Sequence, residues 1–330
     1  MTAGGGAETH RHRHVIYRPG MVDELETGIH RVTFELPFGI DHVHCYFLRS
    51  STGGWILVDT GLGSRDPQAR WGPVLAELDA PVERIVVTHM HPDHVGGAND
   101  VAGLTGAPVL QGREDHAQCV TAWGARDPER FAAYWSEHGM PASHVQGLAQ
   151  ESDRLIAAVH WPREPELLEP GDEVDGWRVE VLRGHADGHI VLLRDGVMIA
   201  GDVILGGITP AIGLYPNSRP DPLGDYFETL DRIEELAPRV AYSGHKDPVT
   251  DPAGRAREIR AHHVERLDRA VGALDGRPLS AYEVSLSLFG SELSTTLRRF
   301  ATAEALAHLE RLVRDGRAER AGSGYLKTGI

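Results

Sequence analysis

Cysteine is scarce in this sequence, because only Cys45 and Cys119 occur among its 330 residues. Two cysteines this far apart form neither a metal-binding spacing nor a disulfide framework, so we expect reduced thiols. The N-terminal stretch MTAGGGAETHRHRH contains no apolar segment and does not fit a secretory signal. Together these two absences predict a cytoplasmic protein.

Positive charge and long apolar runs are also lacking. The 33 Lys and Arg residues are outnumbered by 48 Asp and Glu residues, and the net charge is -15 with histidine counted as neutral. Proteins that bind phosphate backbones usually carry a basic patch, so this balance argues against nucleic acid as the main partner. No apolar run approaches transmembrane length, which argues against a membrane partner. We expect a small-molecule substrate, and the composition is compatible with a homo-oligomer.

The sequence does contain strand patterns that alternate with helical ones. A helix-like stretch, HVGGANDVAGLTG, separates the last two of the early strand-like segments IHRVTFELPF, HVHCYFLRS, GWILVDTG, RIVVTH and APVLQG. Strands return later in WRVEVLRGH, HIVLLRDGVMIAGD and RVAYSGH. Strands that alternate with helices predict a layered domain of the α/β class.

Three further stretches differ from this pattern. Residues 1–14 are predicted to be a flexible tail, and residues 15–257 form the main domain. Within it, residues from about 112 to 170 are predicted to be a helical insertion, because their apolar residues recur at helical spacing. Residues 258–330 show the order helix, helix, helix, hairpin, which is a winged-helix outline.

Metal-ligand residue types are concentrated in THMHPDHVGG and at the ends of predicted strands. Loops at the carboxyl ends of parallel strands can reach a common point, so we expect these side chains to converge. Imidazole and carboxylate suit zinc, iron or manganese, and seven ligands fit two ions that share a carboxylate. We expect two divalent metal ions, with zinc preferred over iron or manganese. The candidate ligands are His89, His91, Asp93, His94, His185, Asp202 and His245.

These residues also carry a family resemblance. The segment HMHPDH resembles the H-x-H-x-D-H signature of the metallo-β-lactamase-fold hydrolases, and GH at 184–185, GD at 201–202 and GH at 244–245 follow in the family's order. DHVHCYFLRS and GGWILVDTGL resemble that fold's opening hairpin, with Asp59 in its usual place. The resemblance implies a four-layer αβ/βα sandwich and hydrolysis at a binuclear metal centre.

The resemblance also implies how the ligands divide between the two ions. The first ion would be held by His89, His91 and His185. The second would be held by Asp93, His94 and His245, with Asp202 bridging both.

Catalytic roles follow from the same resemblance. A hydroxide between the ions would be the nucleophile, since metal binding lowers the pKa of water from about 15.7 towards 7. Asp93 and Asp202 are therefore the catalytic candidates, and Asp93 is placed to orient the water or take its proton. Asp59 would hold a ligand loop without binding metal itself.

The expected substrate is the thioester or ester of a small acyl group. A lactone is the first alternative and a phosphodiester in RNA the second, because the winged-helix outline is similar to the subfamily of β-lactamase-like protein 2, which includes an endoribonuclease. The expected recognition helix, TAEALAHLERLVRDG, mixes acids with arginines, so we favour a structural or interface role for it. A mononuclear iron dioxygenase acting on persulfides is an alternative of a different class.

Six residues outside the ligand set are candidate substrate contacts. One shares a face of the first hairpin with His42, three lie in the long loop after Asp202, and two are aromatic residues of the insertion. Plain packing is the alternative reading for each of them. The six are His44, Tyr215, Asn217, Arg219, Tyr134 and Trp135.

Overall fold

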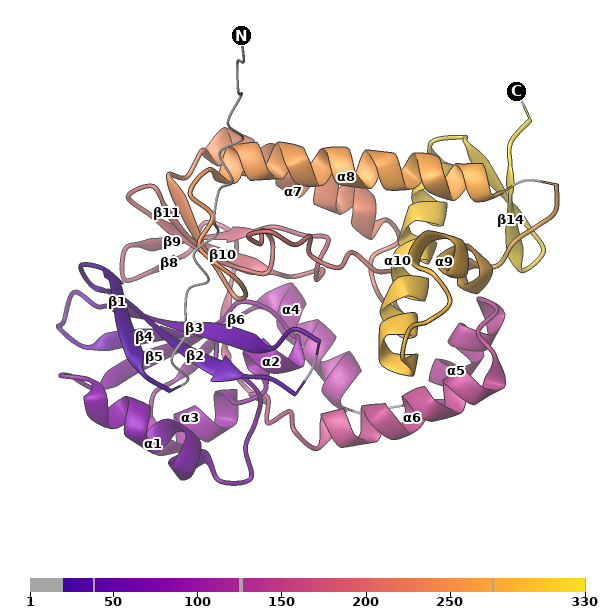
Figure 1. Cartoon of the computed structure of the whole chain (residues 1–330). Helices are drawn as coiled ribbons and strands as arrows, with labels where there is room; N and C mark the ends of the chain where they lie inside the picture. The colour runs from indigo at the N-terminus through magenta and orange to yellow at the C-terminus, as the bar shows by residue number, and fades with distance from the viewer. Residues whose placement is uncertain (1–19, 38, 125–126, 275, 330) are drawn as a thin grey trace, which may run out of the picture.

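Two β-sheets pack face to face in the computed structural model, with helices on both outer sides (Figure 1). The structure describes residues 20–37, 39–124, 127–274 and 276–329. The predicted tail, residues 1–14, lies outside the described residues.

The first sheet has seven strands in sequence order and combines both kinds of pairing. Strands β1 to β4 form an antiparallel meander, and β4 to β7 pair in parallel. The parallel pairs are possible because helices α1 (Pro67–Glu77), α2 (Pro92–Val95) and α3 (Ala98–Thr105) return the chain to the same end of the sheet. The strands are β1 (Val22–Glu26), β2 (Ile29–Glu35), β3 (His42–Arg49), β4 (Trp55–Val58), β5 (Val82–Val87), β6 (Val109–Gly112) and β7 (Glu166–Leu168).

The second sheet has five strands in the order β12, β11, β10, β9, β8. Among its described strands only β11 and β12 pair in parallel, and α7 (Pro222–Leu236) connects them. Because β10 runs antiparallel to both of its neighbours, β9, β11 and β12 all point in the same direction. The strands are β8 (Glu173–Val174), β9 (Trp177–Val181), β10 (Ile190–Arg194), β11 (Val197–Gly201) and β12 (Val240–Ser243).

Three apolar cores hold the four layers together. Residues such as Leu48, Val86 and Trp177 are buried between the two sheets. Trp71 of α1 belongs to the core on the outer face of the first sheet, and Leu230 of α7 belongs to the core on the outer face of the second. Burying such side chains stabilises the fold by roughly 1.5–3 kcal/mol each. The predicted four-layer α/β sandwich is confirmed.

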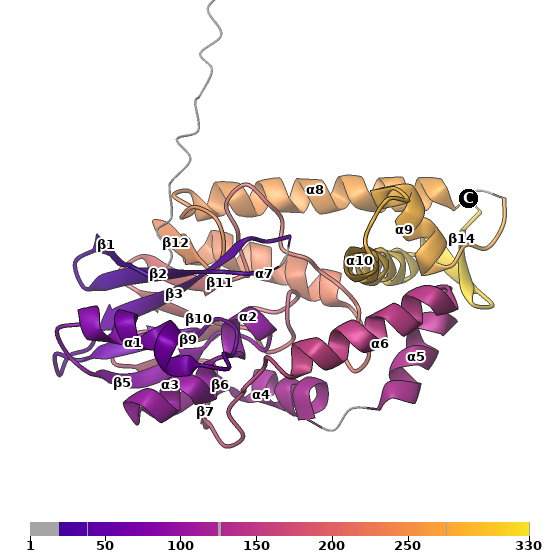
Figure 2. The same ribbon diagram turned by 60° about the horizontal axis from the view of Figure 1, so that its bottom comes forward.

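The insertion is helical, and strand β7 falls within its predicted range. It contains α4 (Arg113–Cys119), the π-helix η1 (Val120–Gly124), α5 (Pro128–Glu137) and α6 (Ala142–Ile156). Strand β7 then joins the edge of the first sheet beside β6, so the part outside the sandwich is shorter than residues 112–170. Figure 2 shows α5 and α6 beside the C-terminal helices, and Trp135, Leu148 and Ala303 form a small core between them.

The C-terminal part has the predicted order of three helices and a hairpin. Helix α8 (Pro252–Ala273) spans the predicted domain boundary after residue 257, and α9 (Ala281–Phe289), α10 (Thr295–Arg314), β13 (Ala318–Ala321) and β14 (Gly324–Lys327) follow. Helix α10 contains the expected recognition helix except for its last two residues, yet most of its residues from 301 to 312 are buried. Among the described residues, no helix is long and apolar enough to cross a membrane.

Candidate metal centre

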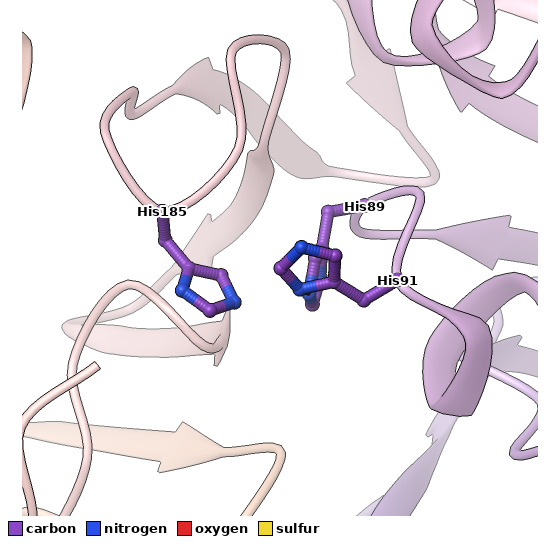
Figure 3. Close-up of side chains that lie close together, drawn as sticks. All are labelled: His89, His91 and His185. Atoms are coloured by element: carbon purple, nitrogen blue, oxygen red, sulfur yellow. The ribbon is translucent and has the colours of Figure 1, made fainter. Parts of the chain in front are cut away.

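The metal-ligand side chains lie at one edge of the sandwich. His89 follows β5, Asp202 follows β11 and His245 follows β12, each within two residues of the strand end. His185 lies four residues beyond β9. Figure 3 shows His89, His91 and His185 pointing toward a common centre.

A short turn after β5 gathers several of the ligands. Pro92 begins the single-turn helix α2, which carries Asp93 and His94. Gly96 and Gly97 then let the chain pass directly under Thr60, because a Cβ on Gly97 would lie 2.6 Å from the Thr60 carbonyl oxygen. The glycines after the motif are therefore needed for this close approach.

The ligand atoms form overlapping groups whose members lie within 4.8 Å of one another. One group is the predicted first set and another is the predicted second set. A third joins His89, His94 and Asp202. The Asp202 Oδ2 atom lies 3.2 Å from His245 Nε2, 3.5 Å from His94 Nε2 and 3.6 Å from His185 Nε2. This oxygen therefore stands between the two predicted sets, where a bridging ligand is needed.

Hydrogen bonds at the far nitrogen fix the orientation of three imidazoles. His94 Nδ1 lies 2.8 Å from Asp59 Oδ2, His185 Nδ1 lies 2.9 Å from the Ala211 carbonyl oxygen, and His245 Nδ1 lies 2.6 Å from the His42 carbonyl oxygen. Each Nδ1 donates to an acceptor, so Nε2 is the nitrogen of each ring that faces the site. Such partners outside the ligand set are typical of histidines that bind metal.

Asp59 connects two segments of the centre. It has φ 62°, a left-handed conformation that few non-glycine residues adopt. Its carboxylate accepts hydrogen bonds from the Thr88 backbone N–H and hydroxyl, each at 2.8 Å, as well as from His94. It thereby ties the end of β5 to α2.

Several polar atoms in the centre have no hydrogen-bond partner among the described residues. They are His94 Nε2, His185 Nε2 and Asp202 Oδ1, and all three are buried. A buried polar atom without a partner costs about 1–3 kcal/mol, so such a group is rare in a native structure. Divalent cations would satisfy all three atoms, and the donor set therefore fits the metals that the sequence implies.

The electrostatics of the centre also suit cations. Burial lowers the pKa of His91 to about 3, which leaves its imidazole neutral and able to donate a lone pair. Burial raises the pKa of Asp93, but His94 and His245 lower it to about 2 overall. Burial lowers the pKa of His245, whereas Asp202 and Asp93 raise it to about 10. In the metal-free protein a proton on His245 balances these carboxylates, and a bound cation would displace it.

Two of the six predicted substrate contacts disagree with the structure, because both side chains are buried. His44 is 0% exposed, and its ring nitrogens lie 2.9 Å from Thr33 Oγ1 and 3.1 Å from the Lys246 carbonyl oxygen. It therefore supports the segment that carries His245. Trp135 is also 0% exposed, because it lies in the core that joins the insertion to α10. Neither side chain has surface left for a substrate.

The other four predicted contacts lie where the insertion meets the loop after Asp202, and for them a substrate role stays a prediction. The Tyr134 hydroxyl donates to the Leu214 carbonyl oxygen at 2.8 Å, and Tyr215 packs against Trp135. Asn217 accepts a hydrogen bond from Arg130. Arg219 is paired with Asp225. These contacts hold the loop in place.

Sequence reasoning missed His189. Its ring stacks on that of His89 at 4.4 Å between centroids, and its Nε2 accepts a hydrogen bond from the Asp202 backbone N–H at 3.0 Å. The strand-end pattern predicts ligands after strands, whereas His189 precedes β10, which begins at the same edge because it runs in the opposite direction. The repeated GH in GHADGH was the available signal.

Comparison with known proteins agrees with this geometry. The metallo-beta-lactamase superfamily model matches residues 38–245, and the metallo-beta-lactamase-like C-terminal domain model matches residues 267–325. The crystal structure of a metallo-beta-lactamase family protein from Thermus thermophilus is 38% identical, with a TM-score of 0.78 over 92% of this chain and 100% of that one.

Three curated proteins are similar over most of their length. The probable metallo-hydrolase YqjP of Bacillus subtilis is 26% identical over 88% of this chain and 92% of its own. The beta-lactamase-like protein 2 homolog of Drosophila melanogaster is 26% identical over 82% of each chain. The atrochrysone carboxyl ACP thioesterase of Passalora fulva is 24% identical over 79% of this chain and 68% of its own. The chain therefore belongs to the metallo-β-lactamase superfamily and is a metallo-hydrolase.

Proposed function

We propose that this metallo-hydrolase cleaves the thioester or ester of a small acyl substrate at a centre of two divalent ions. The observation that carries the proposal is the position of Asp202, whose Oδ2 lies 3.2–3.6 Å from imidazole nitrogens of both ligand sets. A shared carboxylate in this position is what a binuclear hydrolytic site needs. A mononuclear iron dioxygenase needs one metal ion, so one of the two complete sets of metal ligands would bind no ion.

The two ions would supply an activated water and polarise the substrate carbonyl. The protein supplies an ionised carboxylate at the same place. Asp93 Oδ2 lies 3.4 Å from His245 Nε2, and the side chain keeps 16% of its surface exposed. Its low pKa keeps it ionised at neutral pH, so it can accept a hydrogen bond from the attacking water and orient it.

Three observations support a small acyl group over RNA. Most residues of helix α10 from 301 to 312 are buried, so this stretch is not free to enter a nucleic-acid groove. The Passalora fulva relative is named a thioesterase. A thiol is a better leaving group than an alcohol or an amine, which favours a thioester. The net charge of -15 adds no long-range attraction for a polyanion. We therefore propose a small-molecule substrate and no nucleic-acid partner.

The test is a comparison of substrates at matched enzyme concentration and physiological salt. Purified protein reconstituted with zinc is assayed on acyl thioesters, aryl esters, lactones, a phosphodiester and single-stranded RNA. We expect the highest kcat/KM on a thioester or ester, and we expect chelation to abolish it. Efficient RNA cleavage without acyl hydrolysis would contradict the proposal. Turnover of lactones alone would contradict an open-chain thioester or ester and would identify the substrate as a cyclic ester.

A further inference from the structure

We propose that the first two helices of the insertion, α4 and η1, are the scaffold of the three-histidine half of the metal centre. Asp115 and Trp123 are its positioning residues. Neither side chain is a candidate ligand, and both act on the peptide segment between two ligands. The inference rests on metal binding by this family and not on the identity of the substrate.

The first contact fixes the backbone between His89 and His91. The Met90 N–H donates to Asp115 Oδ1 at 2.8 Å, and the Met90 carbonyl oxygen accepts from Trp123 Nε1 at 2.8 Å. Both polar groups of this one residue are thus held by the insertion, one by α4 and the other by η1. Because His89 and His91 are the neighbours of Met90, rotation of that peptide segment would turn both imidazoles away from the metal.

The second contact fixes the turn that carries His185. The Asp187 N–H donates to Gln118 Oε1 of α4 at 3.1 Å. Gly188 then lies against the start of α4, since a Cβ at this position would come within 2.1 Å of the Asp115 backbone nitrogen. The turn can therefore pack on α4 only because residue 188 is glycine.

Asp115 is itself held firmly. It is 0% exposed, and its Oδ2 accepts a hydrogen bond from Gln111 Nε2 at 2.5 Å. Gln111 belongs to β6, so its hydrogen bond anchors Asp115 to the first sheet. The Gln111 Oε1 atom is buried and has no partner in the described part of the chain. If the Gln111 side-chain amide flips by 180°, its Oε1 atom can accept a hydrogen bond from the side-chain NH2 group of an asparagine at position 115. Asp115→Asn is therefore a conservative replacement.

These hydrogen bonds act on the segments that carry all three histidines of the first set, and none of the three ends on a ligand of the second set. His94 is oriented by Asp59, and His245 is oriented by the His42 carbonyl oxygen. Loss of the hydrogen bonds that Asp115 and Trp123 make to Met90 should therefore lower the affinity for one ion more than the affinity for the other. Partners of this kind typically contribute about 10- to 100-fold in metal affinity.

The test measures the two zinc dissociation constants by chelator competition, beginning with metal-free protein. In Asp115→Ala and Trp123→Phe we expect one constant to rise by about 10- to 100-fold while the other stays close to the wild-type value. Asp115→Asn should restore most of the lost affinity. Anomalous scattering from crystals of a variant containing one equivalent of zinc should place that ion at Asp93, His94 and His245.

Trp161→Phe is the matched control for Trp123→Phe. The Trp161 indole N–H is buried and has no hydrogen-bond partner in the described residues. Trp161→Phe therefore removes a buried indole N–H without removing a hydrogen bond. Thermal unfolding of each metal-free variant separates a loss of folding from a loss of affinity. The proposal is overturned if both constants rise equally, if neither rises in Trp123→Phe, or if Trp161→Phe gives the same effect.

Discussion

At the scale of single residues, the centre depends on groups that are placed by neighbours rather than by their own helix or strand. Asp202 lies between the two ligand sets, and its backbone N–H is held by His189. Gly201, just before it, has φ 47°, and a Cβ there would lie 2.6 Å from the His189 ring. The local chain is therefore shaped to present one carboxylate at one point.

Asp202→Ala should remove the bridging carboxylate and with it at least one metal ion per chain. We expect kcat/KM to fall by about 100-fold or more, about 2.7 kcal/mol or more of transition-state stabilisation. Metal analysis and steady-state kinetics measure both effects. Wild-type metal content together with wild-type turnover would show that Asp202 is not a shared ligand.

At the scale of elements, helices α8 and α10 are joined by a buried histidine pair. His263 Nδ1 lies 3.2 Å from His308 Nε2, and both side chains are 0% exposed. Glu304 stands beside them but is already paired with Arg266, so we interpret the pair as a packed, neutral contact rather than a metal site. Burial lowers the pKa of His263 to about 2 and that of His308 to about 4.

The sign of the resulting pH dependence follows from those lowered values. Below about pH 6.5 the unfolded chain binds protons that the two buried imidazoles do not, so the free energy of unfolding falls as pH decreases. At pH 5 each imidazole should contribute about 2 kcal/mol to this loss. In metal-free protein, His308→Leu should lose less thermal stability between pH 7 and pH 5 than wild type does.

A histidine outside this contact is the control for that comparison. His144→Leu changes a partly exposed imidazole on α6. Its unfolding midpoint should follow the wild-type pH profile. Parallel profiles for wild type and His308→Leu would mean that the buried pair does not govern the acid stability.

At the scale of the whole molecule, much of the fold and of the ligand set could be predicted from the sequence, because each ligand follows a recognisable apolar strand or lies in one dense motif. Short elements such as β7 and β8 carry too few residues for a periodic signal. His44 and Trp135 were predicted as substrate contacts because periodicity gives the face of a side chain but not the segment that covers it. That covering segment comes from distant parts of the chain, such as Lys246 and Ala303.

We propose that two ions share this edge of the sandwich, and metal counting on the purified protein tests this most directly. We predict two divalent ions per chain by elemental mass spectrometry, with hydrolysis lost on chelation and regained as the second equivalent is restored. A single iron per chain, with oxygen-dependent turnover and no gain from a second equivalent, would contradict the account.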